Sequence, residues 1–236
     1  MRVRIKNQLE KCIRPPIKAL SRGTTRYGLP VVFVMVLAWL AGGFDIRLPL
    51  PPRDQGNICS IFRAHPEWFD YARASEERWG TPIATQIAFV RYESSFRSHV
   101  MARRTRLFGF LPWRRVSTAY GYAQALDPVW GEYMAEAAES RFAQRSQMQH
   151  ALDFIGWYNH KSHEGVGISK FSPHHLYLAY HEGRTGYLRG SYKSKPGVQK
   201  TAKRVARQAS VYAGQLAECE AEFRCRRFYQ FGPFCG

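Results

Sequence analysis

The chain has 236 residues and a hydrophobic fraction of 45%, which is enough apolar material for one packed domain of ordinary size or two small ones. This composition excludes wholesale disorder, and five cysteines are too few for a disulfide scaffold. Lys and Arg number 35 against 18 Asp and Glu, so the formal net charge is +17. A chain this cationic is expected to meet a polyanion, such as nucleic acid, an anionic membrane face or an acidic cell-wall polymer.

The first segment to interpret is a basic tail followed by an apolar stretch. Residues 1–28 carry eight basic side chains and one acidic one, and the uncharged residues 29–44 follow directly. With Tyr27 and Gly28, this stretch approaches the lower limit of roughly 17–25 residues for a membrane-spanning helix. We expect an uncleaved anchor; the alternative is a signal peptide cut after Ala41-Gly42-Gly43. Either reading keeps the tail cytoplasmic and exports the rest, which predicts a bacterial inner-membrane protein with a periplasmic domain, or a protein released into the periplasm.

The exported part contains four cysteines, and an oxidising compartment preserves disulfides. They are Cys59, Cys219, Cys225 and Cys235. Four cysteines allow three pairings, and the sequence alone does not choose between them. We favour Cys59–Cys219 together with Cys225–Cys235. Cys219 falls on the buried face of the last predicted helix, which suits a structural disulfide.

The remaining elements predict a mainly α protein. Residues 45–57 form a Pro-rich linker in this interpretation, and residues 58–236 form one helical domain with a Cys-containing C-terminal tail. Helix starts and stops are marked by proline, capping residues and glycine. These markers are His65-Pro66 and Gly80, Thr81-Pro82, Asp127-Pro128 as a cap, a Ser146/Gln149 capping box, and Ser172-Pro173 with Gly183. A final helix is expected over 198–219 from its four-three spacing of apolar residues, and a short hairpin between Val100 and Ala119.

A carboxylate falls on the core-facing stripe of the helix that follows Pro82. The stripe runs through Ile83, Ile87 and Val90 to Glu93, with aromatic residues on either side. Partial burial and the negative end of the helix dipole both raise the pKa of a carboxyl group. A glutamic acid that stays protonated near neutral pH is what protonation of a glycosidic oxygen requires. The alternative is an ordinary salt-bridged or solvent-exposed glutamate at a helix end.

Three short strings add to this observation. They are Arg91-Tyr92-Glu93-Ser94-Ser95-Phe96 at a helix end, Gly121-Tyr122-Ala123-Gln124 before a helix, and Ala179-Tyr180-His181-Glu182-Gly183 at a later helix end. In this order and setting, from Trp79 to Gly183, the sequence resembles the lytic transglycosylases of the soluble-lytic-transglycosylase (SLT) type, relatives of goose-type lysozyme. The hallmark strings of that family are Glu-Ser-x-Phe, Gly-Leu-Met-Gln and Ala-Tyr-Asn-x-Gly.

The resemblance implies a lysozyme-like helical domain that binds peptidoglycan glycan strands in a groove, without metal or cofactor. The implied reaction cleaves the β-1,4 bond between N-acetylmuramic acid and N-acetylglucosamine and leaves a 1,6-anhydro product. Glu93 matches the single catalytic acid and base, which differs from the two-carboxylate scheme of most glycosidases. Ser94 would hold the peptide or lactyl side of the muramoyl residue. The other implied groove residues are Gly121, Tyr122, Ala123, Gln124, Tyr180 and His181.

The sequence departs from the family in three places. His181 stands where asparagine is usual, and Tyr122 where leucine is frequent. The insertion 103–115 is basic and aromatic. It could be a lip that grips glycan or touches the membrane surface, or a surface loop with no special task.

Other functions stay open at this point. Glu182 or Glu164 could supply a second carboxylate, which would make the protein a hydrolytic lysozyme. A wall-binding module without turnover and an anchored partner of cell-envelope machinery are further alternatives. We expect the inner membrane, through 29–44, and peptidoglycan as partners, but no nucleic acid. The five histidines between His160 and His181 show no metal-ligand spacing.

Overall fold

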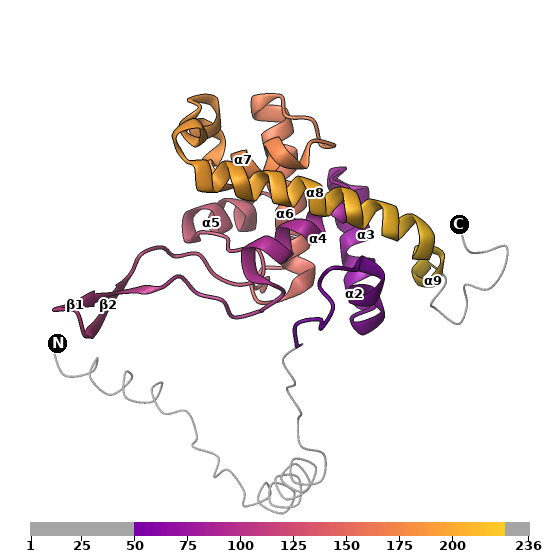
Figure 1. Cartoon of the computed structure of the whole chain (residues 1–236), viewed down its shortest axis with the longest axis horizontal. Helices are drawn as coiled ribbons and strands as arrows, with labels where there is room; N and C mark the ends of the chain where they lie inside the picture. Colours follow the sequence, from indigo (N-terminus) through magenta and orange to yellow (C-terminus); the bar gives the residue numbers. More distant parts are fainter. Residues whose placement is uncertain (1–49, 225–236) are drawn as a thin grey trace, which may run out of the picture. The chain divides into compact units, whose positions relative to one another are not determined.

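The structure, a computed structural model, describes residues 50–224, and most of this range is helical (Figure 1). The helices are α2 (Ile58–Ala64), α3 (Glu67–Trp79), α4 (Ile83–Ser94), α5 (Asp127–Glu136), α6 (Met148–Val166), α7 (Pro173–Leu188), the 3-10 helix η1 (Ser191–Ser194), α8 (Pro196–Cys219) and α9 (Ala221–Arg224). Two strands, β1 (Arg104–Leu107) and β2 (Leu111–Arg115), form one hairpin. The predicted mainly α fold with a small hairpin is confirmed for these residues.

Three helix–helix contacts form most of the core. Helix α6 packs on α3, and α8 crosses both α4 and α7 (Figure 1). The buried stripe of α8 follows the predicted four-three spacing through Ala202, Val205, Ala209 and Tyr212. Burial of this stripe ties the C-terminal helix to α4, the helix that carries Glu93, so α8 helps to position the site.

The predicted helix starts hold within one or two residues, whereas the end of α7 and two of the predicted caps need correction. Asp127 is not a cap: it lies in the first turn of α5, and its carboxylate pairs with Arg145 at 2.8 Å. The capping box is also wrong, because Gln147 stands at the cap of α6 and no side chain makes a cap bond there. Gly183 interrupts α7 with a φ of 75°, but the chain resumes its helical course to Leu188.

A disulfide joins the first described helix to the end of α8. It links Cys59 with Cys219, both buried, across 160 positions of sequence. This half of the predicted pairing is therefore confirmed. The other half, Cys225–Cys235, lies outside the described residues, as do the predicted tail 1–28 and the apolar segment 29–44.

The described part of the predicted linker lies against the helices. The Tyr212 hydroxyl on α8 donates to the Gln55 carbonyl, and the Asn57 side chain accepts from the Ser60 amide at the start of α2. Within residues 50–224, no helix combines the length and the apolar character that crossing a bilayer requires.

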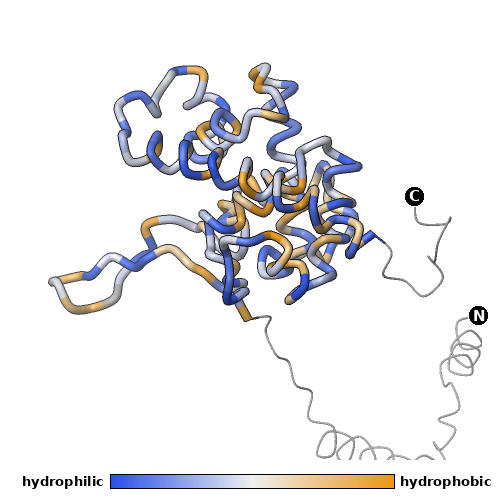
Figure 2. The backbone as a smooth tube through the Cα atoms, turned by 45° about the vertical axis from the view of Figure 1, so that its right-hand side comes forward, coloured by the Kyte–Doolittle hydropathy of each residue, from blue (hydrophilic) through white to orange (hydrophobic). Residues whose placement is uncertain are grey.

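The hairpin extends away from the helices. Its strands pair antiparallel, with Arg104 opposite Arg115 and Leu107 opposite Leu111, and three residues, 108–110, connect them. Figure 2 shows hydrophobic residues at its tip and hydrophilic ones along its arms, at a distance from the apolar interior of the helices.

Candidate active site

Glu93 lies in the last turn of α4, where the chain turns sharply. Ser95 and Phe96 both adopt left-handed backbone angles, with φ of 52° and 58°, which is uncommon for residues other than glycine. The fully buried Phe96 ring, stacked on Trp68 with centroids 5.7 Å apart, holds this turn in place. The Glu-Ser-Ser-Phe string therefore builds a strained helix end, a feature that gathers at functional sites.

The carboxyl group of Glu93 is surrounded by protein although part of the residue stays open to solvent. Burial raises its pKa from 4.5 to about 7, and a side-chain hydrogen bond with Tyr177 opposes this rise. No cation of the described residues contributes to the shift. A group with this pKa is protonated about half of the time at neutral pH, so it can give up or accept a proton there.

Two tyrosines of α7 bring the three sequence strings together. Tyr177 and Tyr180 lie three residues apart on one face of the helix, and the ring of Phe89 on α4 meets both edge-to-face, at 5.4 and 5.3 Å. The Tyr180 hydroxyl donates to the Ala123 carbonyl at 2.6 Å. Burial raises the pKa of both tyrosines, and the nearby charge of Glu93 raises it further. Both hydroxyls are therefore neutral hydrogen-bond donors at physiological pH.

The loop that holds Ala123 is fixed by its own residues. Gly121 has a φ of 81°, and a Cβ atom at this position would lie 2.1 Å from the Arg145 carbonyl oxygen. The Gln124 amide nitrogen donates to the carbonyl oxygens of Gly121 and Val100, at 2.8 and 3.0 Å. Only glycine fits at position 121, and the Gln124 side chain stabilises the loop through its two hydrogen bonds to backbone carbonyl groups.

A cavity of about 200 Å³ opens between this loop and helices α5, α6 and α7. Three of the predicted site residues line it: Gln124, Tyr180 and His181. The other lining residues are Ala125, Leu126, Val129, Phe154, Tyr158, Glu182 and Gly183. Glu93 is not among the lining residues; Tyr180 lies between the two, since it lines the cavity and its ring meets Phe89 on α4, the helix that carries Glu93.

Two predicted substrate contacts do not face this cavity. Ser94 is 1% exposed, and its hydroxyl donates to the Val90 carbonyl one turn earlier at 3.1 Å. Tyr122 is fully buried and meets Trp68 edge-to-face at 5.9 Å. A small polar residue can satisfy itself on the helix backbone, and a large aromatic residue gains more by packing in the core. Ser94 and Tyr122 therefore support the site from the protein interior, and neither side chain is placed to contact a substrate.

Glu182 shows the opposite chemistry to Glu93. Its carboxylate accepts hydrogen bonds from Ser191 and from Lys195, the latter at 2.9 and 3.0 Å, and His181 lies 3.1 Å from it. These partners, Ser191 first, hold its pKa at about 2. Glu182 is thus a fixed anion that ties the kink of α7 to η1. Glu164, the other second-carboxylate candidate, is 63% exposed beside His163.

The sequence interpretation missed Tyr177. A signal was available, because Tyr177 precedes Tyr180 by three positions and therefore shares its helix face. Among residues 50–224, no group of three or more His, Cys, Asp or Glu side chains is placed to hold a metal ion.

Comparison with known proteins identifies the family. A family model described as the transglycosylase SLT domain matches residues 25–219. The chain therefore belongs to the SLT transglycosylase family, as its sequence strings predict, and this family associates it with lytic-transglycosylase activity on peptidoglycan in general. No curated protein and no solved structure gives a significant match.

Proposed function

We propose that the protein is a lytic transglycosylase with a lysozyme-like fold that cleaves the bond between N-acetylmuramic acid and N-acetylglucosamine. The observation that carries the proposal is the Glu93 carboxyl group, whose pKa of about 7 suits an acid and base and whose hydrogen-bond partner Tyr177 lies one helix turn from Tyr180, a residue that lines the cavity. Family membership and the mainly helical fold with one small hairpin support it.

The reaction needs one carboxyl group in two protonation states. Protonated Glu93 donates its proton to the glycosidic oxygen as the bond from that oxygen to C1 of the muramoyl residue breaks, and N-acetylglucosamine leaves with a new hydroxyl group. The resulting carboxylate then takes the proton of the muramoyl 6-hydroxyl, whose oxygen bonds to C1. A 1,6-anhydro ring forms, no water is consumed, and Glu93 ends protonated again. With a pKa near 7, the same group can donate a proton in the first step and accept one in the second at neutral pH.

Two tyrosines support this chemistry in the proposal. The hydrogen bond with Tyr177 stabilises the carboxylate formed in the first step, which limits the rise of its pKa. Tyr180 holds the Ala123 carbonyl and forms a wall of the cavity, so it positions the loop against α4 and α7. Gln124 and His181 line the same cavity, where they would meet the sugar.

A hydrolytic lysozyme is less well supported. A second carboxylate that activates water must be able to accept a proton. Glu182 is already hydrogen-bonded on both oxygens and its pKa is about 2, so it is a poor base. The location remains a proposal from the sequence: basic residues 1–28 before the apolar segment 29–44 favour a periplasmic domain held at the inner membrane.

The test is a digest of purified peptidoglycan sacculi with the full chain kept in mild detergent. Soluble products are identified by mass spectrometry for the wild type, Glu93→Gln and the matched variant Glu182→Gln. The proposal expects anhydro-muropeptides from the wild type and from Glu182→Gln, and none from Glu93→Gln. Products one water heavier that vanish with Glu182→Gln would establish hydrolysis instead. Sacculi that bind the wild type and release nothing would establish a binding module.

A further inference from the structure

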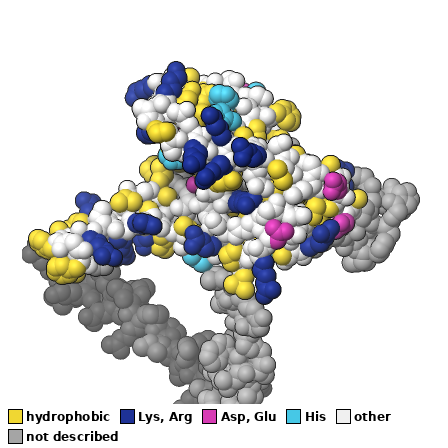
Figure 3. All heavy atoms as spheres, in the orientation of Figure 1, with side chains coloured by type: hydrophobic (Ala, Val, Ile, Leu, Met, Phe, Trp, Pro, Cys, Tyr) yellow, Lys and Arg dark blue, Asp and Glu magenta, His cyan; other side chains and the backbone are white. Residues whose placement is uncertain are grey.

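The hairpin presents large apolar side chains to solvent. Phe108 is 81% exposed, Phe110 74% and Trp113 53%. Figure 3 shows hydrophobic side chains gathered at the tip, with Lys and Arg side chains behind it. The apolar group is isolated from the core formed by residues 50–224, so packing within this range does not explain it. Exposed apolar residues gathered at one place indicate an interaction surface.

The turn itself is built at a conformational cost. Phe108 and Gly109 both have positive φ, 54° and 81°, and two such residues in a hairpin turn are usually Asn-Gly or Gly-Gly. An aromatic residue is strained in this conformation. A Cβ atom added at Gly109 would meet nothing within 4 Å, so the tip is open on that side. Phe108 therefore occupies a position where asparagine would make the folded hairpin more stable, and its ring is exposed to solvent.

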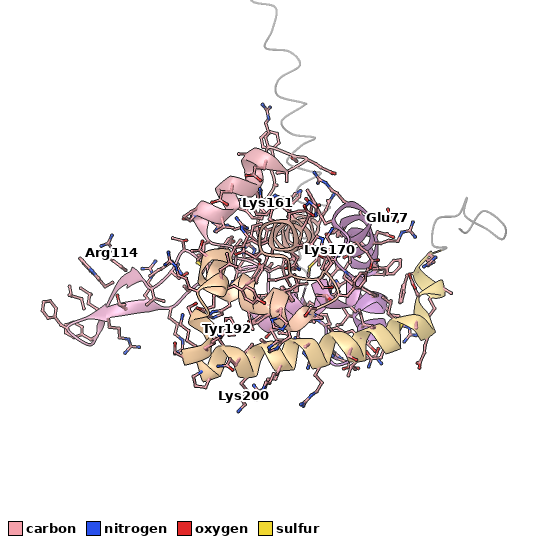
Figure 4. All side chains as sticks on the ribbon, turned by 90° about the horizontal axis from the view of Figure 1, so that it is seen from above. Glu77, Arg114, Lys161, Lys170, Tyr192 and Lys200 are labelled. Atoms are coloured by element: carbon pink, nitrogen blue, oxygen red, sulfur yellow. A yellow bond between two sulfur atoms is a disulfide. The ribbon has the colours of Figure 1, made fainter. Side chains whose placement is uncertain are left out.

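Arginines follow the apolar tip along both strands. All five are exposed, and no ion pair among residues 50–224 involves any of them. They are Arg103, Arg104, Arg106, Arg114 and Arg115. Figure 4 shows the Arg114 side chain projecting sideways from the hairpin, which itself lies apart from the helices. An apolar end with unpaired cations behind it matches the layers of an anionic bilayer, where acyl chains lie beneath phosphate groups.

We propose that the hairpin tip inserts into the headgroup layer of a bilayer that contains anionic lipid. Phe108 and Phe110 enter the acyl boundary, Trp113 lies at headgroup level, and the arginines pair with lipid phosphates. Glycan is the other occupant to consider, but a sugar needs polar partners for its hydroxyl groups. The hydroxyl group of Thr105 is already bonded to the Arg114 carbonyl at 2.9 Å, and Phe108 and Phe110 at the tip carry no polar side-chain atom. The donors present are the Trp113 indole N–H and the arginines, and guanidinium groups match phosphate best. This contact is separate from any anchor at 29–44 and from the proposed reaction.

The experiment follows Trp113 in the full chain reconstituted into vesicles with brominated acyl chains, which quench nearby tryptophan. Subtracting the signal of Trp113→Phe isolates this residue from the other five tryptophans. We expect at least twofold quenching of Trp113 with phosphatidylglycerol in the vesicles and none with phosphatidylcholine alone. Replacing Arg104, Arg106 and Arg114 by glutamine removes the quenching, since each arginine near an anionic surface strengthens binding by about fivefold. Replacing them by lysine preserves it.

Matched variants separate the tip from apolar exposure in general. The double change Phe108→Ser and Phe110→Ser is expected to abolish quenching of Trp113. Phe142→Ser with Phe171→Ser, at residues 70% and 80% exposed elsewhere on the surface, leaves it unchanged. Asparagine tolerates the left-handed conformation of residue 108, so Phe108→Asn removes the aromatic ring while the hairpin stays folded.

Two results would overturn the proposal. One is a Trp113 signal in anionic vesicles that equals the signal in phosphatidylcholine. The other is quenching that soluble glycan strands reverse at unchanged lipid, which would assign the tip to glycan. Glu93→Gln is expected to keep the lipid contact, so a failure here is distinct from a failure of the proposed reaction.

Discussion

Replacing Glu93 by glutamine is expected to stabilise the protein at alkaline pH while it removes the proposed reaction. The folded protein raises the pKa of this carboxyl group from 4.5 to about 7, mainly by burial. In the unfolded chain the group ionises near its ordinary value. Between pH 4.5 and 7 the folded state therefore keeps a proton that the unfolded state has lost, and the free energy of unfolding falls as pH rises.

The size of the effect follows from the two pKa values. Each pH unit across this window costs about 1.4 kcal/mol, so the total loss is roughly 3 kcal/mol once pH passes 7. Glutamine does not titrate, keeps nearly the same shape and can still bond to Tyr177. Below pH 4.5, Glu93→Gln and the wild type are thus expected to be about equally stable. At pH 8 the variant is more stable by roughly 3 kcal/mol, which raises Tm by about 6–12 °C for a domain of this size.

The assay is thermal unfolding of the full chain in detergent from pH 4 to 9, reported as the difference in Tm between the two proteins at each pH. Taking the difference cancels the titration of every other group. A difference that stays constant over the whole range, or a variant that melts below the wild type at pH 8, would refute the account of Glu93 as a desolvated acid. Glu182→Gln is the control: that carboxylate is stabilised as an anion, so its loss destabilises the protein at pH 8.

Three further outcomes are expected from the same structure. Tyr177→Phe removes the hydrogen bond that opposes the rise of the Glu93 pKa. The loss of glycan cleavage at alkaline pH, which is set near pH 7 in the wild type, therefore moves to higher pH, and cleavage slows at least tenfold. Product release measured from pH 5 to 9 checks this. Gly121→Ala forces a Cβ atom to 2.1 Å from a backbone oxygen and is expected to cost several kcal/mol, whereas Gly109→Ala, at the same φ of 81° but in open space, costs about 1 kcal/mol; unequal shifts in Tm distinguish them. Replacing Cys59 and Cys219 by serine opens a loop of 160 positions and lowers the free energy of unfolding by roughly 2–5 kcal/mol in denaturant titrations, and equal stability of oxidised wild type and variant would contradict this.

The parts of the fold that the sequence predicted well are those encoded locally. Gly80 ends α3 in a left-handed conformation, and the predicted prolines stand at the start of α4, α5 and α7. The four-three stripe of α8 also placed Cys219 on the buried side, where it meets Cys59. Caps and helix faces are set by residues within a turn or two, so predicting them needed no knowledge of distant packing, whereas the meeting of Cys219 with Cys59 joins segments 160 positions apart.

The parts that could not be predicted depend on contacts between distant segments. Asp127 reads as a cap in the sequence, but Arg145 lies within 2.8 Å and draws its carboxylate into an ion pair. Tyr122 reads as a groove residue by its place in the string, yet the core takes its ring because Trp68 offers an aromatic partner. Glu93 itself was recognised from its position on the helix stripe, whereas its partner Tyr177 is 84 positions away and became visible only once α7 packed on α4.

The two glutamates near the cavity show why one carboxyl group is enough for the proposed reaction. Glu93 is buried next to Tyr177, no cation of residues 50–224 contributes to its titration, and its pKa rises to about 7. Glu182 is held by Ser191, Lys195 and His181, and its pKa falls to about 2. Environments that separate two pKa values this far assign different roles to chemically identical groups. Glu93 changes its proton state near neutral pH and can act as acid and then as base, whereas Glu182 stays an anion whose charge fixes the kinked end of α7. In the proposed reaction, Glu182 stays committed to structure, and the attacking group of the second step is the 6-hydroxyl of the muramoyl residue, which a 1,6-anhydro product requires.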